Sequence, residues 1–175
     1  MSNQKLSAKA GQLHMAKLLR IKMHLDCQNV LPDLHHGNLR RLDIRNDLPA
    51  VAQLMVEAYE NSVDREDDHG LAFAKGELNG LVAGKYGAYI SAASFVAEES
   101  GVIVSAALTT LWRSEPLLAY LMTSPRFQGQ GLGRSMLSAV GAAIRNLQYP
   151  GLKLVVTEAN ESALSLYRGF GFKEL

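Results

Sequence analysis

A short run of glycines is the feature that most constrains how this chain can fold. Gly129, Gly131 and Gly133 alternate with larger residues in segment 128–134, Gln-Gly-Gln-Gly-Leu-Gly-Arg. The residues before it form an apolar run at 116–123, and those after it place apolar residues at helical spacing over 132–147. This pattern predicts a strand, a tight loop and an amphipathic helix in direct succession.

The glycine loop has the properties of an anion-binding site. Glycine has no side chain, so a ligand can come close to the backbone. The first amides of the following helix have no partner inside the helix and lie at the positive end of its dipole. Such a helix start suits a diphosphate, and Arg126 and Arg134 add positive charge beside it. A tight turn that binds no ligand is the alternative interpretation.

Two common nucleotide-binding motifs do not fit this loop. A dinucleotide-binding G-x-G-x-x-G motif starting at Gly129 would need a glycine where the chain has Arg134. A P-loop needs Gly-Lys followed by Ser or Thr, and segment 124–134 contains no lysine. Neither motif therefore explains the glycines.

The rest of the chain predicts a mixed α/β arrangement. Strict alternation over residues 19–26 predicts a half-buried strand, with a helix continuing to Met23 as the alternative. A turn at 99–101 between apolar runs predicts a hairpin over 94–112. Asn46 or Asp47 is the expected N-cap of the helix at 49–61. The remaining expected elements are a linker at 29–38, strands at 42–45, 116–123 and 152–157, helices at 49–61, 70–81 (broken by Gly80 and Gly84), 132–147 and 162–168, and a last fragment at 172–175.

Two blocks of the chain resemble the GNAT superfamily of acyl-CoA-dependent N-acetyltransferases. Gln128, Gly131 and Gly133 match its Q/R-x-x-G-x-G/A signature. The second block consists of Asn160, Ala163, Leu166-Tyr167 and Gly171-Phe172. The resemblance covers about residues 40–175. It implies a mixed, mostly antiparallel sheet flanked by helices, with a splay between the fourth and fifth strands. The expected organisation is a basic N-terminal extension and linker at 1–40 and a GNAT-like domain at 41–175.

The resemblance also implies roles for individual residues. Acetyl-CoA would be the co-substrate, and no metal is expected. Tyr167 would be the catalytic acid that protonates the leaving thiolate, with a packed aromatic residue as the alternative. Backbone groups of Leu121 and Thr123 would pair with the pantetheine arm. The full set expected to bind the cofactor is Leu121, Met122, Thr123, Gln128, Gly129, Gln130, Gly131, Leu132, Gly133, Arg134 and Asn160.

The implied activity is direct transfer of an acetyl or acyl group to a primary amine of a small molecule or peptide. A catalytically weak CoA-binding sensor or interaction module is the alternative function. The general base stays unassigned, because the glutamate that many relatives carry four residues before the Thr123 position is Ala119 here. The acidic segment 64–68 is interpreted as a solvated loop, with a source of the base as the alternative.

The resemblance predicts an open position at the edge of the sheet. Relatives usually continue past the Gly-Phe block with a further strand beside the strand equivalent to 152–157, whereas this chain ends at Leu175. An uncovered strand edge leaves backbone groups unpaired. We therefore expect residues 19–26 to fill the position, from the same chain or from a partner.

Charge and cysteine content complete the expectations. The net charge of +1 gives no overall attraction to nucleic acid or an anionic membrane, although residues 1–41 carry seven Lys or Arg against two Asp. The single Cys27 cannot form an internal disulfide, which fits a reducing compartment. The expected protein is cytoplasmic, without a membrane span, and possibly a homodimer.

Overall fold

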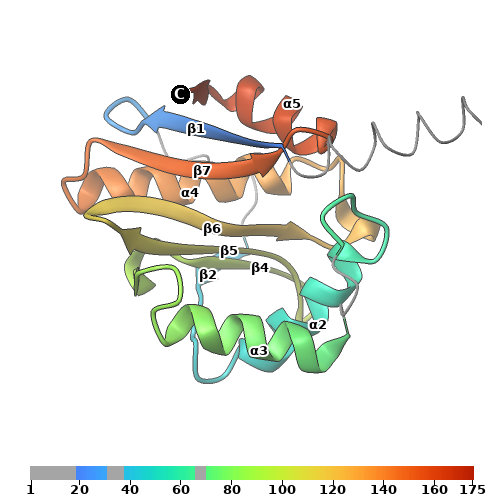
Figure 1. The fold of residues 1–175 in the computed structure, drawn as a ribbon. Helices are drawn as coiled ribbons and strands as arrows, with labels where there is room; N and C mark the ends of the chain where they lie inside the picture. Colours follow the sequence, from blue (N-terminus) through green and yellow to red (C-terminus); the bar gives the residue numbers. More distant parts are fainter. Residues whose placement is uncertain (1–18, 31–37, 66–69) are drawn as a thin grey trace, which may run out of the picture.

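A mixed, mostly antiparallel sheet organises the computed structural model, which describes residues 19–30, 38–65 and 70–175 (Figure 1). The order of paired strands is β2-β4-β5-β6-β7-β1-β8, and β3 pairs with β5 outside this path. β6 and β7 are parallel, and the other pairs are antiparallel. The strands are β1 (Arg20–Asp26), β2 (Leu39–Arg41), β3 (Ala88–Tyr89), β4 (Phe95–Glu99), β5 (Val102–Trp112), β6 (Glu115–Thr123), β7 (Gly151–Thr157) and β8 (Lys173–Glu174). The fold class predicted from the sequence is confirmed.

Helices cover both faces of the sheet (Figure 1). One buried cluster, which includes Leu54, Leu78 and Met122, joins α2 and α3 to one face. A second cluster, which includes Met136 and Leu154, joins α4 and α5 to the other face. The helices are α2 (Leu48–Tyr59), α3 (Leu71–Val82), α4 (Leu132–Asn146) and α5 (Glu161–Phe170). Gly80 lies inside α3 and does not break it, contrary to expectation.

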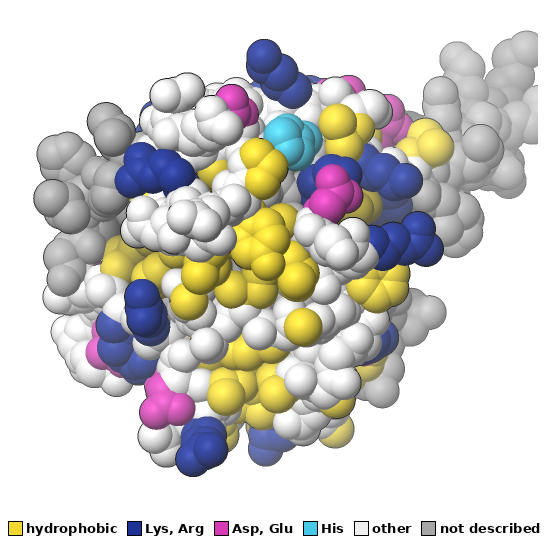
Figure 2. All heavy atoms as spheres, turned by 90° about the vertical axis from the view of Figure 1, so that its left-hand side faces the viewer, with side chains coloured by type: hydrophobic (Ala, Val, Ile, Leu, Met, Phe, Trp, Pro, Cys, Tyr) yellow, Lys and Arg dark blue, Asp and Glu magenta, His cyan; other side chains and the backbone are white. Residues whose placement is uncertain are grey.

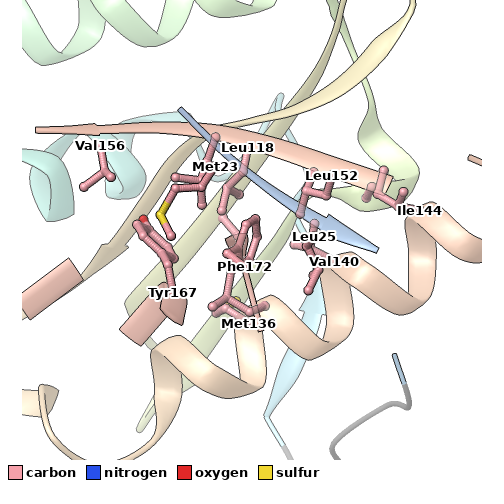
Figure 3. Close-up of a cluster of buried hydrophobic side chains, with 14 of the residues drawn as sticks. Met23, Leu25, Leu118, Met136, Val140, Ile144, Leu152, Val156, Tyr167 and Phe172 are labelled. Atoms are coloured by element: carbon pink, nitrogen blue, oxygen red, sulfur yellow. The ribbon is translucent and has the colours of Figure 1, made fainter. Parts of the chain in front are cut away.

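β1 occupies the sheet position beside β7. The two strands pair from Arg20 opposite Thr157 to Asp26 opposite Gly151. Met23 is fully buried in the same cluster as Tyr167 (Figure 3), whereas Lys22 is exposed. The predicted strand is therefore confirmed and the helix alternative is wrong, because alternation is what buries one side of this segment. The strand comes from the same chain, and it covers the edge of β7 as expected.

The end of this pairing requires glycine at position 151. A Cβ atom built there would lie 2.1 Å from Nε2 of His24 and 2.8 Å from the backbone oxygen of Leu25. No other residue fits without moving β1 away from β7. Gly151 therefore permits the close approach of the two strands at this end.

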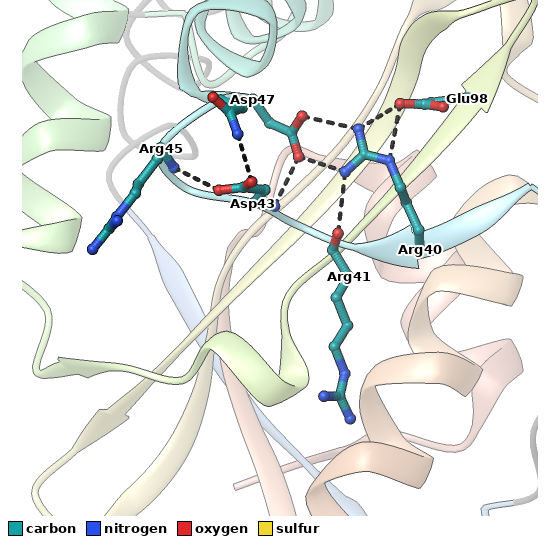
Figure 4. Close-up of polar contacts among 7 residues, drawn as sticks. Arg40, Arg41, Asp43, Arg45, Asp47 and Glu98 are labelled. Carbon is teal, nitrogen blue, oxygen red and sulfur yellow. Dashed lines mark hydrogen bonds and ion pairs between the residues drawn. The ribbon is translucent and has the colours of Figure 1, made fainter.

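The segment that leads into α2 differs from expectation. The predicted strand at 42–45 is wrong, because the strand β2 is Leu39–Arg41 and a turn follows at 44–46. The Asp47 carboxylate accepts hydrogen bonds from the Arg40 guanidinium, one of them 2.6 Å long, and from the backbone N–H of Asp43 (Figure 4). Arg40 thereby holds the pKa of Asp47 below its usual range. Asp47 is the N-cap residue of α2, but its side chain makes no capping hydrogen bond.

The surface offers no clear membrane-spanning element. Within the described ranges, no helix is both long and apolar enough to cross a bilayer. Figure 2 shows hydrophobic side chains across the middle of one face, with Lys and Arg around them. Large hydrophobic side chains that are at least partly exposed include Trp112, Leu147 and Val155. Apolar atoms make up a large part of the accessible surface of folded proteins in general.

We expect Met23→Ala to reduce the free energy of unfolding by about 2–5 kcal/mol, because it removes a fully buried side chain and leaves a cavity. Lys22→Ala on the exposed side of β1 is the matched control, with an expected change within about 0.5 kcal/mol. Urea unfolding followed by circular dichroism measures both. Equal effects of the two substitutions would contradict the placement of β1.

Candidate functional site

A cleft opens where β6 and β7 separate. Among the described residues, the two strands are paired at one position, Leu117 with Lys153. A cleft of about 1190 Å³ lies between them, lined by residues 117–123 of β6 and 154–157 of β7, together with the glycine loop and the start of α5. This is the predicted splay between the fourth and fifth strands of the domain.

A β-bulge in β6 accompanies the separation. Leu118 pairs with Thr109 and Tyr120 pairs with Leu108, so Ala119 is an extra residue without a partner on β5. A bulge bends its strand and increases the local twist. It lies two residues beyond Leu117, the last position at which β6 is paired with β7. The bulge therefore turns β6 away from β7 at the inner end of the cleft.

The β6 backbone beyond the bulge presents hydrogen-bonding groups to the cleft. The N–H of Ser124 donates to the carbonyl of Val104 on β5, at 2.8 Å. Successive N–H groups of a strand point to opposite edges, so the N–H groups of Met122 and Ser124 face β5. Those of Leu121 and Thr123 therefore point away from β5. An extended ligand can pair with this edge like an added strand. The Thr123 carbonyl at the same edge accepts a 3.2 Å hydrogen bond from the Gln128 side chain.

The start of α4 has free amides beside this edge. Its N-cap residue, Gly131, has φ +86, a left-handed conformation that favours glycine. The first helical hydrogen bond runs from the N–H of Ser135 to the carbonyl of Gly131. The N–H groups of residues 132–134 precede that bond, and no described side chain caps the helix. This is the geometry that the sequence predicted for an anion site.

Tyr167 on α5 forms part of the cleft wall. Its side chain is 9% exposed, and its ring packs against Phe172 with centroids 5.6 Å apart. Burial raises the pKa of the phenol, and the negative charge of Asp64 raises it further. The phenol therefore stays protonated at neutral pH and can donate a proton. It is also a packed core residue, so the two interpretations of Tyr167 are compatible.

Asp64 lines the cleft, although the sequence predicts a solvated loop there, with a source of the base as the alternative. Its side chain is 17% exposed, so interpreting it as part of a solvated loop is wrong for this residue; residues 66–69 lie outside the described ranges. The carboxylate accepts hydrogen bonds from the Thr157 hydroxyl and, at 2.8 Å, from the Asn160 amide. Asn160 also caps α5, since its oxygen accepts from the N–H of Ala163. The acidic segment was the one available signal, and it did not reveal these distant partners.

The expected cofactor residues gather around the cleft with one exception. Gln130 is outside the lining, and its side chain donates to the Arg126 carbonyl. Arg134 donates to the Gly169 carbonyl at 3.2 Å, with its guanidinium 5.4 Å from the Phe170 ring centroid. These contacts hold a positive charge next to the loop. The expected site residues that line the cleft are Leu121, Met122, Thr123, Gln128, Gly129, Gly131, Leu132, Gly133, Arg134, Asn160 and Tyr167.

No metal-binding arrangement is evident in the part of the chain that the structure covers. Residues 19–30, 38–65 and 70–175 contain no group of three or more His, Cys, Asp or Glu side chains that could hold an ion.

Comparison with solved structures identifies the fold. A GCN5-related N-acetyltransferase from Sphaerobacter thermophilus has a TM-score of 0.67 and 17% identity over 89% of this chain, and the match spans 48% of that protein. The PaiA N-acetyltransferase from Thermoplasma acidophilum, solved with coenzyme A, has a TM-score of 0.64 and 17% identity over 77% of this chain and 88% of its own. YncA from Salmonella typhimurium, solved with acetyl-CoA, has a TM-score of 0.58 and 22% identity over 76% of this chain and 77% of its own.

The sequence comparison agrees with the fold. Residues 91–174, which include β5, β6, the glycine loop and α5, match the family described as the acetyltransferase (GNAT) domain. No curated protein matches the chain. The sequence match over residues 91–174 and the fold both support the GNAT superfamily. The chain spans about half the length of the Sphaerobacter protein.

We expect Gly131→Ala to reduce the free energy of unfolding by about 1–2 kcal/mol, because alanine is strained in a left-handed conformation. Gly76→Ala is the matched control, since Gly76 lies within α3 with no atom within 4 Å of an added Cβ. It should raise stability by about 0.5–1 kcal/mol. Urea unfolding measures both, and the same sign for the two changes would contradict the assigned loop conformation.

Proposed function

We propose that this chain transfers an acetyl group from acetyl-CoA to a primary amine of a small molecule or peptide by direct attack. The observation that carries the proposal is the arrangement of three groups along one cleft. These are the free edge of β6, the uncapped start of α4 and the buried phenol of Tyr167. They suit the arm, the diphosphate and the thioester of acetyl-CoA respectively.

The cofactor would bind in an extended form. The N–H groups of Leu121 and Thr123 would pair with the pantetheine arm, as an added strand pairs with a sheet edge. Gln128 would have to share or release the Thr123 carbonyl that its side chain now contacts. The amides of residues 132–134 would bind the diphosphate, with the helix dipole and Arg134 adding favourable charge.

The chemistry would need no covalent intermediate with the protein. The lone pair of a neutral amine attacks the thioester carbonyl carbon, the carbon–sulfur bond then breaks, and the CoA thiolate leaves. The acylated nitrogen loses its surplus proton to water, and a proton from water later restores the Tyr167 phenol. Tyr167 would donate its phenolic proton to that thiolate. Burial keeps the Tyr167 proton in place until this step, because it raises the pKa of the phenol.

A CoA-binding sensor on the same fold is the second candidate. It is favoured by Ala119, which places no carboxylate at the bulge of β6. A sensor would bind the cofactor in the same cleft without turning it over. Binding and turnover must therefore be measured separately.

We expect the protein to bind CoA in calorimetry and to release free CoA thiol from acetyl-CoA when a primary amine acceptor is present. A coloured thiol reagent at pH 8 can follow release across a panel of alkylamines and peptides. Cys27 should not interfere, because it is fully buried and burial, reinforced by the Asp26 charge, raises its pKa to about 12. Binding without release on any acceptor would favour the sensor, and absence of CoA binding would reject both functions.

We expect Tyr167→Phe to reduce kcat by about 100-fold or more, the contribution typical of a general acid, with the Kd for CoA changed little. Tyr149→Phe is the matched control, because Tyr149 is partly buried and lies outside the cleft lining. Steady-state kinetics and calorimetry on both variants test this role. An unchanged kcat for Tyr167→Phe would leave Tyr167 as a packing residue only.

A further inference from the structure

Asp64 is a cleft carboxylate for which the assignments above give no role. It follows α2 in the chain, whereas its partners Thr157 and Asn160 stand at the end of β7 and the start of α5. One oxygen accepts from each partner. The carboxylate is therefore held from two elements at the wall of the cleft that faces β6, and it is not free to turn into solvent.

Among the described residues, Asp64 is hydrogen-bonded to neutral donors, and its ion pair with Arg20 is long and exposed. Thr157 and Asn160 are neutral donors. In the part of the chain that the structure covers, the cation paired with Asp64 is Arg20 of β1, whose Nη1 lies 4.0 Å from Oδ1. The Arg20 side chain is 54% exposed, so solvent screens this pair. A cationic group entering the cleft would find a carboxylate that is still able to accept a close ion pair.

Asp64 lies near the place assigned to the thioester. Burial raises the pKa of the phenols of Tyr167 on α5 and Tyr59 on α2, and the negative charge of Asp64 raises each pKa further. Tyr59, Asp64 and Tyr167 all line the same cleft. The charged and titratable groups near Asp64 among the described residues are thus two protonated phenols and Arg20, 4.0 Å away. None of them can remove a proton from an ammonium group.

The other semi-buried carboxylate of the cleft is less suited to this task. Glu77 on α3 accepts hydrogen bonds from Lys85 at 2.5 Å, from Tyr86 at 2.9 Å and from Tyr120 at 3.0 Å. Its charge is already compensated by a close lysine, and its oxygens are engaged. Glu77 therefore anchors β6 to α3. Asp64 is the partly buried cleft carboxylate without a close cation, whereas Glu161, which also lines the cleft, is exposed to solvent.

We propose that Asp64 binds the acceptor as an ammonium ion and takes up its proton before attack. This inference rests on the proposed acetyltransferase function and extends it to the substrate class, a cationic primary amine. One proton moves from the ammonium nitrogen to the carboxylate and frees the lone pair. That lone pair forms the new carbon–nitrogen bond as the carbon–sulfur bond breaks, and the thiolate takes the Tyr167 proton. The amide nitrogen loses its second proton on collapse, and both side chains then return to their starting states by exchange with water.

The dependence of kcat/KM on pH tests the proposal, with an alkylamine that the unaltered protein acetylates. An enzyme that accepts the ammonium form should show a flat profile from about pH 6.5 to 9, below the amine pKa of about 10. Asp64→Asn and Asp64→Ser remove the carboxylate and must rely on the neutral amine. Their kcat/KM should be about 100-fold lower at pH 7 and should rise about tenfold per pH unit.

Three controls separate this role from a structural one. Asp26→Asn, at the far end of β1 from the cleft, should keep both the rate and the flat profile. Asp64→Glu should retain a flat profile at a reduced rate. The melting temperature and the Kd for CoA show whether the Asp64 variants are folded. If either Asp64→Asn or Asp64→Ser fails to fold, the other still tests the proposal.

The outcomes distinguish this proposal from the one on which it rests. If the unaltered protein acetylates an amine and the Asp64→Asn and Asp64→Ser profiles stay flat, the role of Asp64 is wrong while the acetyltransferase function stands. A uniform loss of rate without a new slope also overturns it, since that pattern indicates a positioning effect. If the unaltered protein acetylates no amine, the proposed function itself fails.

Discussion

The separation of β6 from β7 is the constraint on which the rest of the site depends. Two parallel strands that stayed paired would satisfy each other's backbone groups and leave no room for a ligand. Here the pairing stops after Leu117 and Lys153, and the bulge at Ala119 bends β6 away. The edge of β6, the helix start after Gly131 and the phenol of Tyr167 all face the resulting cleft. If this gap were closed, no extended ligand could pair with β6 and reach the glycine loop that follows it.

The sequence predicted those elements whose determinants are local. The hairpin of β4 and β5 was predictable because Ser100 and Gly101 form a turn with positive φ between apolar runs. The glycine loop was predictable because its backbone requirements are written into adjacent residues. β1 was predictable as a strand because apolar and polar residues alternate along it, although helix propensity alone favoured a helix about equally. Pairing with β7 decides between the two, and that pairing joins segments far apart in the chain.

The expectations that were wrong or incomplete depend on distant partners. The position of β2 was missed because the Asp47 carboxylate binds the Arg40 guanidinium and the Asp43 N–H. These contacts hold a turn within segment 42–45, which the sequence predicted to be extended. Asp64 was interpreted as solvated because its own neighbours in sequence are acidic. The residues that bury it, Thr157 and Asn160, are brought there by the fold of the C-terminal half. A pattern within one segment carries no information about such contacts.

The origin of β1 has a kinetic consequence. β7 forms one wall of the cleft and pairs with β1, with Asp26 opposite Gly151. β1 and β7 are far apart in the sequence, and α5 follows β7. Joining residues so distant closes a long loop, which costs entropy before any contact is gained. The hairpin of β5 and β6 closes a short loop and can form early. We therefore expect β1 and β7 to pair later in folding than the hairpin of β5 and β6.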